Sequence, residues 1–179
     1  MEIIKTQLAD LFVIKPRVFS DERGEFFESF NQKEFCEKVA NVEFVQDNQS
    51  FSKSGVLRGI HLQKKPFEPG KLVRAIRGEI YDVAVDLRKN SPTFLQYFAI
   101  NLSSNNKLQL WIPEGFGHGF LTLSESAEVA YKATNYYSKE SEITIKYDDS
   151  NIGIKWPKVK TVIISSKDKK GISTSELKF

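Results

Sequence analysis

Apolar and polar residues alternate with a period of two in several short segments of this chain. In the clearest segment, residues 79–88, one side carries Tyr81, Val83, Val85 and Leu87 and the other carries Asp82 and Asp86. Weaker alternation marks residues 98–102, 108–112, 129–133 and 143–147, and turn-forming residues such as Pro113-Glu114-Gly115 separate these segments. Because a period of two is typical of β-strands, many short strands joined by turns predict an all-β sandwich or barrel.

One helix is predicted just after Asn31. Asn31 is a suitable N-cap, and Glu34 stands where it can close a capping box. Phe35, Cys36 and Val39 then share one apolar face. Near the N-terminus, residues 5–14 predict a leading strand. Residues 165–179 are polar and rich in lysine, which on pattern alone indicates a solvated tail.

Size and composition indicate an ordinary globular protein. The chain has 179 residues, of which 40% are hydrophobic and 27% charged, and we expect a single domain over residues 1–179. A chain of this length buries enough surface to fold without a metal or disulfide. The net charge of +3 is small for a nucleic-acid-binding protein, so no nucleic-acid partner is expected.

Cysteine content and hydropathy bear on the cellular compartment. Cys36 is the only cysteine, which excludes an intrachain disulfide and a zinc site built from several cysteines. A reducing, cytoplasmic location is therefore expected. No apolar run approaches the roughly 20 residues that cross a bilayer, so no membrane association is expected.

The two histidines, His61 and His118, both lie beside glycines, where a backbone or ligand can approach closely. Either histidine is also compatible with a hydrogen-bonded residue of the core. Two histidines cannot supply a three-histidine metal site. A site of two histidines and one carboxylate stays possible by count, but no His-x-His or His-x-x-x-His spacing supports it. We therefore expect no metal.

The residues around His61 point to proton transfer. Neither a Gly-x-Ser-x-Gly nucleophile motif nor a Gly-rich phosphate loop is present, so acid–base chemistry is favoured. Arg58 and Lys71 stand among apolar neighbours, which favours an orientation into a pocket over simple surface charge. Strict alternation puts Arg58 and His61 on opposite faces of a strand. Both can line one pocket only if the strand bulges, and Gly59 is the expected position of that bulge.

Long motifs occur in order along most of the chain. They include Phe19-Ser20-Asp21-Glu22-Arg23-Gly24, Phe44-Val45-Gln46-Asp47-Asn48, Leu57-Arg58-Gly59-Ile60-His61, Gly70-Lys71-Leu72-Val73-Arg74, Tyr131-Lys132-Ala133-Thr134-Asn135-Tyr136-Tyr137 and Ser166-Lys167-Asp168. In these motifs the chain resembles the dTDP-4-dehydrorhamnose 3,5-epimerase family. The resemblance covers roughly residues 3–170, and no role is assigned to the polar tail that follows. One departure is Gln49, where many relatives have histidine.

The resemblance implies a fold, an assembly and a reaction. The fold is a cupin-type jelly roll, a β-sandwich or barrel with a few short helices, which works without metal or other cofactor. The assembly is a homodimer in which sheet edges are shared between subunits. The reaction is epimerisation at C3 and C5 of dTDP-4-dehydro-6-deoxy-D-glucose, which gives dTDP-4-dehydro-L-rhamnose for dTDP-L-rhamnose biosynthesis.

The resemblance also implies roles for individual residues. His61 is the base, Tyr131 is the acid and Asp168 is the partner of His61. Lys71 and Arg58 lie near the carbonyl oxygen of the sugar, and His118 lines the same pocket. The residues implied to contact the nucleotide sugar are Arg23, Glu28, Gln46, Asn48, Glu142 and Lys167. Tyr137 is implied to stack on thymine.

Two alternatives to the dual epimerase stay open at this point. One is an epimerase that acts at C3 or C5 alone on a related nucleotide 4-keto sugar. The other is a non-catalytic jelly roll that binds a sugar nucleotide. The presence of His61, Tyr131 and Asp168 argues against the second alternative, whereas the shape of the pocket separates the dual epimerase from the first.

Overall fold

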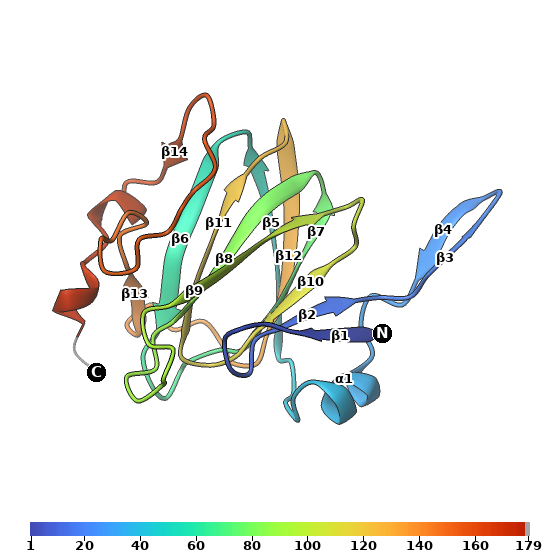
Figure 1. The fold of residues 1–179 in the computed structure, drawn as a ribbon, viewed down its shortest axis with the longest axis horizontal. Helices are drawn as coiled ribbons and strands as arrows, with labels where there is room; N and C mark the ends of the chain where they lie inside the picture. The colour runs from blue at the N-terminus through green and yellow to red at the C-terminus, as the bar shows by residue number, and fades with distance from the viewer. Residues whose placement is uncertain (178–179) are drawn as a thin grey trace.

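The structure, a computed structural model that describes residues 1–177, consists of two facing β-sheets, a projecting hairpin and one short helix (Figure 1). The first sheet contains, in spatial order, β1 (Glu2–Lys5), β2 (Phe12–Lys15), β10 (Gln109–Ile112), β7 (Lys71–Arg77), β12 (Ser126–Ala133) and β5 (Gln46–Lys53). The second sheet contains β13 (Glu142–Thr144), β6 (Val56–Gln63), β11 (Phe116–Thr122), β8 (Glu79–Asp86) and β9 (Tyr97–Ser103). This architecture confirms the predicted cupin-type jelly roll.

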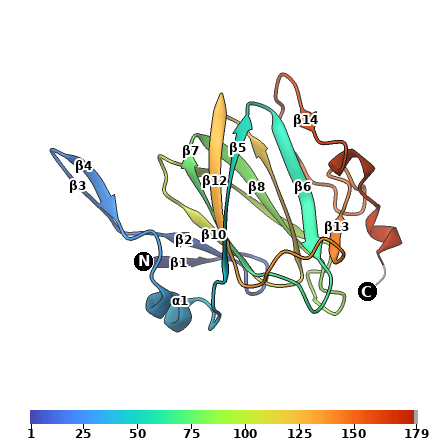
Figure 2. The ribbon, with the colours of Figure 1, turned by 180° about the vertical axis from the view of Figure 1, so that it is seen from behind.

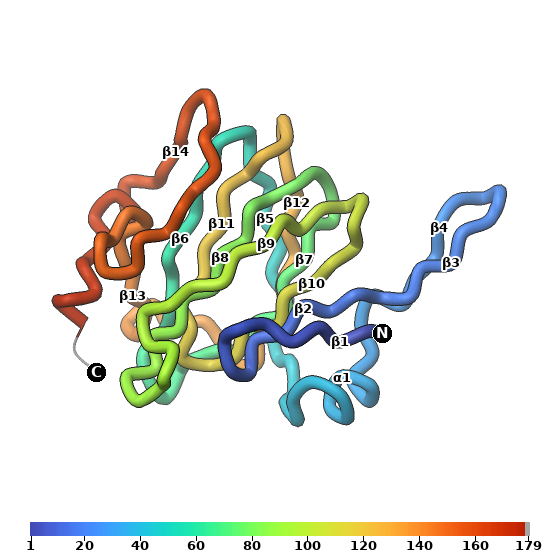
Figure 3. The backbone as a smooth tube through the Cα atoms, in the orientation of Figure 1, coloured from blue at the N-terminus to red at the C-terminus, as the bar shows by residue number. Residues whose placement is uncertain are grey.

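Three smaller elements lie outside these two sheets. The hairpin of β3 (Val18–Asp21) and β4 (Gly24–Phe27) projects away from the sheets, and it is called the arm below (Figures 1 and 2). The helix α1 (Gln32–Lys38) packs Phe35 against Trp111 with ring centroids 5.1 Å apart. The C-terminal segment contains β14 (Ile163–Ile164), η1 (Asp168–Lys170) and η2 (Thr174–Glu176). In space, β14 lies beside β6 and pairs with it in parallel (Figure 3).

The main core lies between the two sheets. It contains Val73, Leu110 and Val129 from the first sheet and Ile80 and Phe120 from the second, all of them buried. A second apolar cluster covers the outer face of the second sheet, where Val83 and Val85 pack with residues that follow β13, such as Ile145 and Ile152. The second sheet is therefore buried on both faces.

In an ordinary surface strand the polar residues of such an alternation face solvent. In β8 they face the protein interior, because both faces of the second sheet are buried. Tyr81, Val83 and Val85 belong to the outer apolar cluster, whereas Asp82 and Asp86, both 0% exposed, share the opposite face with the inward-facing Ile80 and Ala84. Since a buried carboxylate needs partners, each aspartate on this face implies a polar network inside the protein.

Most of the predicted elements are confirmed, and two interpretations are wrong. Residues 5–14 are not one strand, because β1 and β2 form a hairpin whose turn buries Leu8 and Leu11 and is tied by the Thr6 hydroxyl. Residues 165–177 are not a solvated tail, because Asp168 and Thr174 are 4% and 7% exposed. The last two residues, 178–179, lie outside the described part of the chain.

At the start of α1 the predicted N-cap is present, but the predicted capping box is not. The Asn31 side chain accepts a hydrogen bond from the Glu34 amide at 3.1 Å, as expected of an N-cap. The Glu34 carboxylate pairs instead with Lys38 at 3.2 Å and with the N-terminal amine at 3.5 Å.

Within residues 1–177, no helix has both the length and the apolar character that a membrane span requires.

Candidate active site

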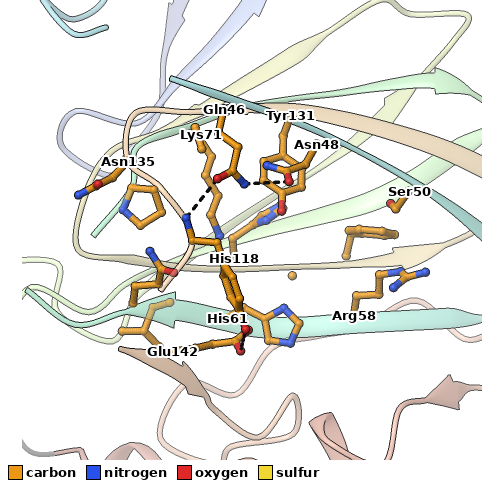
Figure 4. A pocket seen from close by; sticks show the side chains of 17 residues that line it. Gln46, Asn48, Ser50, Arg58, His61, Lys71, His118, Tyr131, Asn135 and Glu142 are labelled. Atoms are coloured by element: carbon orange, nitrogen blue, oxygen red, sulfur yellow. Dashed lines mark hydrogen bonds between the residues drawn. The ribbon is translucent and has the colours of Figure 1, made fainter. Parts of the chain in front are cut away.

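A cavity of about 230 Å³ lies between the two sheets (Figure 4). Nine of the predicted site residues line it: Gln46, Asn48, Arg58, His61, Lys71, His118, Tyr131, Tyr137 and Glu142. They come from β5, β7 and β12 of the first sheet, from β6, β11 and β13 of the second, and from the loop that precedes β13. The two-layer fold thus brings together residues that are up to 96 positions apart (142 − 46).

A bulge in β6 allows Arg58 and His61 to face the same cavity, as the sequence predicts. His61 pairs with His118 and Arg58 pairs with Phe120, so two residues of β6 stand opposite the single residue Gly119. Gly59 has φ of 119°, and a Cβ atom there would lie 2.5 Å from the Gly119 Cα atom. Glycine is therefore required at the bulge for both its conformation and its space.

His61 is held by a buried carboxylate. Its Nε2 atom lies 2.7 Å from Asp168 Oδ1, and Asp168 Oδ2 accepts a hydrogen bond from the Gly59 amide at 3.3 Å. Burial alone would raise the pKa of Asp168, but the bonds from His61, Gly59 and Ser165 outweigh it and lower the pKa below its ordinary value. An anion is therefore fixed on one nitrogen of His61, which orients the ring and leaves its other nitrogen free for a ligand.

His118, which also lines the cavity, belongs to a second histidine–aspartate pair. His118 Nε2 is 2.8 Å from Asp82 Oδ1, and both side chains are buried. The half-buried side chain of Lys71 lines the same cavity. Burial lowers the pKa of Lys71 to about 8, and the negative charges of Asp82 and Glu142 keep it from falling further. The interior of the cavity thus contains a cation whose charge is lost at mildly alkaline pH.

Tyr131 stands across the cavity from His61. Tyr131 belongs to β12 in the first sheet and His61 to β6 in the second, and Figure 4 shows them on opposite sides of the cavity, with Lys71 on the same side as Tyr131. The Lys71 amine lies 5.9 Å from the centre of the Tyr131 ring. Burial and the charge of Glu142 raise the pKa of Tyr131, and Arg58 offsets part of this effect. Its hydroxyl therefore keeps its proton at neutral pH.

Arg58 is fixed by the edge of the first sheet. Its Nε atom donates to the Ser52 hydroxyl at 3.0 Å, and one terminal nitrogen donates to the Phe51 carbonyl at 3.1 Å. Both acceptors belong to β5, so the guanidinium bridges the two sheets at one end of the cavity.

The mouth of the cavity is organised around Glu142 and Gln46. Glu142 accepts a hydrogen bond from the Tyr137 hydroxyl at 2.9 Å and pairs with the Lys167 amine at 2.5 Å. Gln46 accepts from the Tyr137 amide at 3.1 Å and donates to Asn48 at 2.9 Å. The buried amide nitrogen of Asn48 has no partner among residues 1–177, so it is available to an acceptor in the cavity. Lys167 reaches this network only through Glu142.

Two predicted residues are not brought to the cavity of the same chain. Arg23 lies at the turn of the arm, where it is 85% exposed and pairs with Asp21 at 2.6 Å. Glu28 follows the arm, is exposed and accepts a hydrogen bond from Asn31 at 3.2 Å. Both belong to the part of the chain that projects away from the two sheets (Figures 1 and 2).

Sequence reasoning missed two residues with clear positions in the site. Asp82 holds His118, and its isolated charge among Tyr81, Val83 and other apolar residues was the available signal. Gln63 donates to the Tyr136 carbonyl at 3.2 Å and accepts from the Ser138 amide at 2.6 Å, which shapes the loop at the mouth. Its position two residues after His61 on the same strand was a signal that it shares the cavity face.

The donor set does not assemble a metal centre in the described residues. Across residues 1–177, no group of three or more histidine, cysteine, aspartate or glutamate side chains is close enough together to hold an ion. The two histidines instead each contact an aspartate. The arrangement is suited to moving protons and holding an anionic oxygen.

The fold and the cavity define a jelly-roll protein of the cupin type whose pocket is equipped for acid–base chemistry. The model of the dTDP-4-dehydrorhamnose 3,5-epimerase family matches residues 5–176, which include the segment around Asp168. The chain belongs to the dTDP-4-dehydrorhamnose 3,5-epimerase family.

Several relatives match nearly the whole chain. The dTDP-4-dehydrorhamnose 3,5-epimerase of Salmonella typhimurium is 57% identical over 94% of this chain and 92% of its own length. A crystal structure of dTDP-6-deoxy-D-glucose-3,5-epimerase from Legionella pneumophila, in complex with dTDP-4-keto-L-rhamnose, is 47% identical with a TM-score of 0.96 and covers 99% of this chain and 94% of that one. A 3′-monoepimerase from Streptomyces bikiniensis in complex with dTDP-quinovose is 27% identical with a TM-score of 0.89 and covers 95% of this chain and 86% of that one.

Proposed function

We propose that this protein epimerises both C3 and C5 of dTDP-4-dehydro-6-deoxy-D-glucose, giving dTDP-4-dehydro-L-rhamnose for dTDP-L-rhamnose biosynthesis. The observation that carries the proposal is the pair His61 and Tyr131, which face one cavity from opposite sheets together with Lys71, a half-buried lysine that lines the same cavity. Relatives named as 3,5-epimerases reach 57% identity, whereas the monoepimerase reaches 27%. This difference supports action at both carbons.

Proton removal is assigned to His61. The hydrogens at C3 and C5 flank the C4 ketone, so the loss of either as a proton leaves an enolate with its charge on the C4 oxygen. Asp168 contacts Nε2 of His61, which leaves Nδ1 as the nitrogen that accepts the proton. Asp168 also stabilises the imidazolium that forms. A well-positioned base contributes roughly 10²–10⁴-fold to such a step.

The enolate oxygen is assigned to the cations of the cavity. A base alone is too little for an unactivated carbon acid, and each fixed donor to a developing oxyanion contributes roughly another 10²–10³-fold. Lys71 is a half-buried cation that lines the cavity, and Arg58 is fixed by Ser52 and the Phe51 carbonyl. His118, held by Asp82, lines the same space.

Inversion is assigned to Tyr131. The enolate carbon receives a proton from the Tyr131 hydroxyl on the face opposite to His61, so the configuration at that carbon is reversed. The step leaves an imidazolium and a tyrosinate, and both return to their starting states by exchanging protons with water. The same pair then acts at the second carbon after the ring presents it to His61.

The nucleotide is assigned to the mouth of the cavity. Tyr137 offers an aromatic face there and is fixed through Glu142, which in turn pairs with Lys167. Asn48 offers its amide nitrogen and Gln46 holds Asn48 and the Tyr137 backbone in position. Lys167 supplies positive charge near the diphosphate of the substrate.

Arg23 and Glu28 are assigned to the cavity of a second subunit in a homodimer. The arm exposes Phe26 and Phe19, at 73% and 51%, which is unfavourable for an isolated chain. The edge strand β5 of the first sheet likewise exposes Phe51 at 55%. An arm that packs on the first sheet of its partner covers these surfaces and brings Arg23 to the partner's diphosphate site, where its guanidinium can bind two phosphate oxygens.

The remaining proposals concern the domain organisation, the cofactors and the cellular compartment. The chain is assigned to one jelly-roll domain, because both sheets and the C-terminal segment up to residue 177 supply site residues. The reaction as written needs no metal and no organic cofactor. The single Cys36 fits a reducing compartment, and the protein is assigned to the cytoplasm.

Product analysis in deuterated water tests the proposed function. The enzyme is incubated with dTDP-4-dehydro-6-deoxy-D-glucose, and the deuterium content and configuration of C3 and C5 are read by NMR. We expect deuterium and inversion at both carbons. Inversion at one carbon would identify a monoepimerase, and exchange at neither carbon would identify a binding protein. The His61→Asn variant serves as the control, and near-normal turnover by it would remove His61 as the base.

A further inference from the structure

The segment that carries Asp168 has little regular structure of its own. Between β14 and residue 177 its regular elements are two short 3-10 turns, η1 and η2, yet it must hold the Asp168 carboxylate 2.7 Å from His61. Its first end is secured by the parallel pairing of β14 with β6. The contacts that secure its second end centre on Asp149, a buried aspartate that the reaction described above does not use.

Asp149 is saturated with hydrogen bonds from the chain end. It is 4% exposed, and its Oδ2 atom accepts from the Ser173 hydroxyl at 2.8 Å and from the Thr174 amide at 2.9 Å. Its Oδ1 atom accepts from the Thr174 hydroxyl at 2.8 Å and from the Asn151 amide at 3.0 Å. Burial raises the pKa of Asp149, but these bonds outweigh it and lower the pKa below the ordinary value. The group is therefore an anion that binds residues 24 and 25 positions away.

A continuous set of contacts leads from Asp149 to His61. Just before Thr174, the Ile172 amide donates to the Thr144 carbonyl at 2.9 Å, and the Ile172 carbonyl accepts from the Lys146 amide at 3.0 Å. Thr144 pairs with His61 in the sheet, and the neighbouring Ile145 exchanges two backbone hydrogen bonds with Ile60. The strand that carries the base and the segment that carries its partner are thus attached to the same stretch of residues 144–149.

We propose that Asp149 is a positioning residue for the His61–Asp168 pair, which it serves by fixing the far end of the segment that carries Asp168. The inference rests on the proposed function, in which Asp168 orients the base. An amide cannot replace this carboxylate. Each oxygen accepts one backbone amide, from Asn151 and from Thr174, so an asparagine would direct its own N–H₂ group at one of them. Asp149→Asn therefore loosens Thr174 and, through it, the segment that leads back to Asp168.

The test compares Asp149→Asn with a matched control. Asp86→Asn also alters a buried aspartate that accepts bonds from two hydroxyls, here of Ser91 and Thr93. Among residues 1–177 the Asp86 side chain bonds to Arg88, Ser91 and Thr93 and makes no hydrogen bond to the C-terminal segment. Steady-state rates are measured across pH for both variants, together with Tm. We expect Asp149→Asn to lower kcat by about 10- to 100-fold, the scale of loss for a misplaced catalytic group. KM should change less than kcat. Asp86→Asn should lower Tm and leave kcat unchanged.

A double variant separates positioning from general destabilisation. If Asp149 acts through Asp168, adding Asp149→Asn to Asp168→Asn should cause no further loss of kcat, and both single variants should shift the acid limb of the pH profile alike. The inference would be overturned if the double variant lost kcat by the product of the two single losses. It would also be overturned if Asp149→Asn kept a wild-type kcat and pH profile and only its Tm fell. If Asp149→Asn does not fold, Thr174→Val, which removes only a hydroxyl from Asp149, is judged by the same criteria. A wild-type rate for Asp168→Asn would instead refute the proposed pairing of His61 and Asp168, and the inference with it.

Discussion

The change Tyr131→Phe separates the acid from the base. It removes a single hydroxyl from the cavity and leaves the ring, which packs against the core between the sheets. If Tyr131 delivers the proton opposite to His61, the variant can still form the enolate and return a proton from the side of His61. Formation of the inverted sugar should fall by about 100- to 10,000-fold, the usual contribution of a general acid. Exchange of deuterium into C3 or C5 should persist.

The structure also sets the expected cost in stability. Among residues 1–177 the Tyr131 hydroxyl has no hydrogen-bond partner, so its removal leaves no buried group unpaired. We therefore expect a change of less than about 1 kcal/mol in the free energy of unfolding. For a chain of this length that corresponds to a shift in Tm of at most about 2–4 °C. A rate loss with a larger shift would point to damage to the fold.

The assay measures two rates in the same sample. NMR in deuterated water follows the loss of the C3 and C5 proton signals and the appearance of inverted product. Tyr81→Phe is the matched control, because Tyr81 is a partly buried strand tyrosine that faces Trp156 on the outer side of the second sheet. It should retain both rates. Equal loss of exchange and inversion in a folded Tyr131→Phe would refute the acid role and indicate that Tyr131 stabilises the enolate or anchors the substrate.

Four further predictions concern other parts of the site. Asp168→Asn should be slower but active, because it disturbs the orientation of His61 and leaves the imidazole in place; a wild-type rate would contradict the pairing. Since the ammonium form of Lys71 is lost above its pKa of about 8 while Tyr131 keeps its proton, kcat/KM should fall above pH 8. In Lys71→Arg the fall in kcat/KM above pH 8 should vanish. An unchanged fall would exclude Lys71 as its source. Arg23→Ala should raise KM with little change in kcat. Phe26→Asp should convert a dimer into monomers, which light scattering detects as a lower mass. A wild-type KM in the first variant and a wild-type mass in the second would refute the contribution of the arm. Dialysis against a strong chelator should leave the rate unchanged, whereas a stoichiometric metal whose removal abolishes activity would refute the metal-free mechanism.

Local sequence signals predicted the parts of the site that lie within one strand. The alternation in β8, the N-cap of α1 and the bulge at Gly59 each depend on residues a few positions apart. The bulge is the most informative of these, because the conflict between Arg58 and His61 could be resolved only by an extra residue in the strand. Steric and conformational preferences of single residues were sufficient for these inferences.

The parts that pattern alone did not predict depend on contacts between distant segments. Asp168 stands in a lysine-rich stretch with no periodicity, and only the docking of that stretch on β6 buries it beside His61, 107 positions earlier. The resemblance supplied that pairing; the pattern indicated a solvated tail. Asp82 was overlooked for a related reason, since nothing local shows that both faces of its sheet are covered.

The separation of the two sheets has a consequence for the choice of ligand. Facing sheets pack about 10 Å apart, and side chains from both project into that gap. In the proposed mechanism a sugar ring lies flat between His61 on one layer and Tyr131 on the other, with each face turned toward one of the two groups. Residues at the rim of the gap then contact the ring's edge, where sugars differ in their substituents. If the proposed mechanism holds, substitutions at the rim should alter which sugar is accepted, whereas His61 and Tyr131 should still remove and deliver protons on opposite faces.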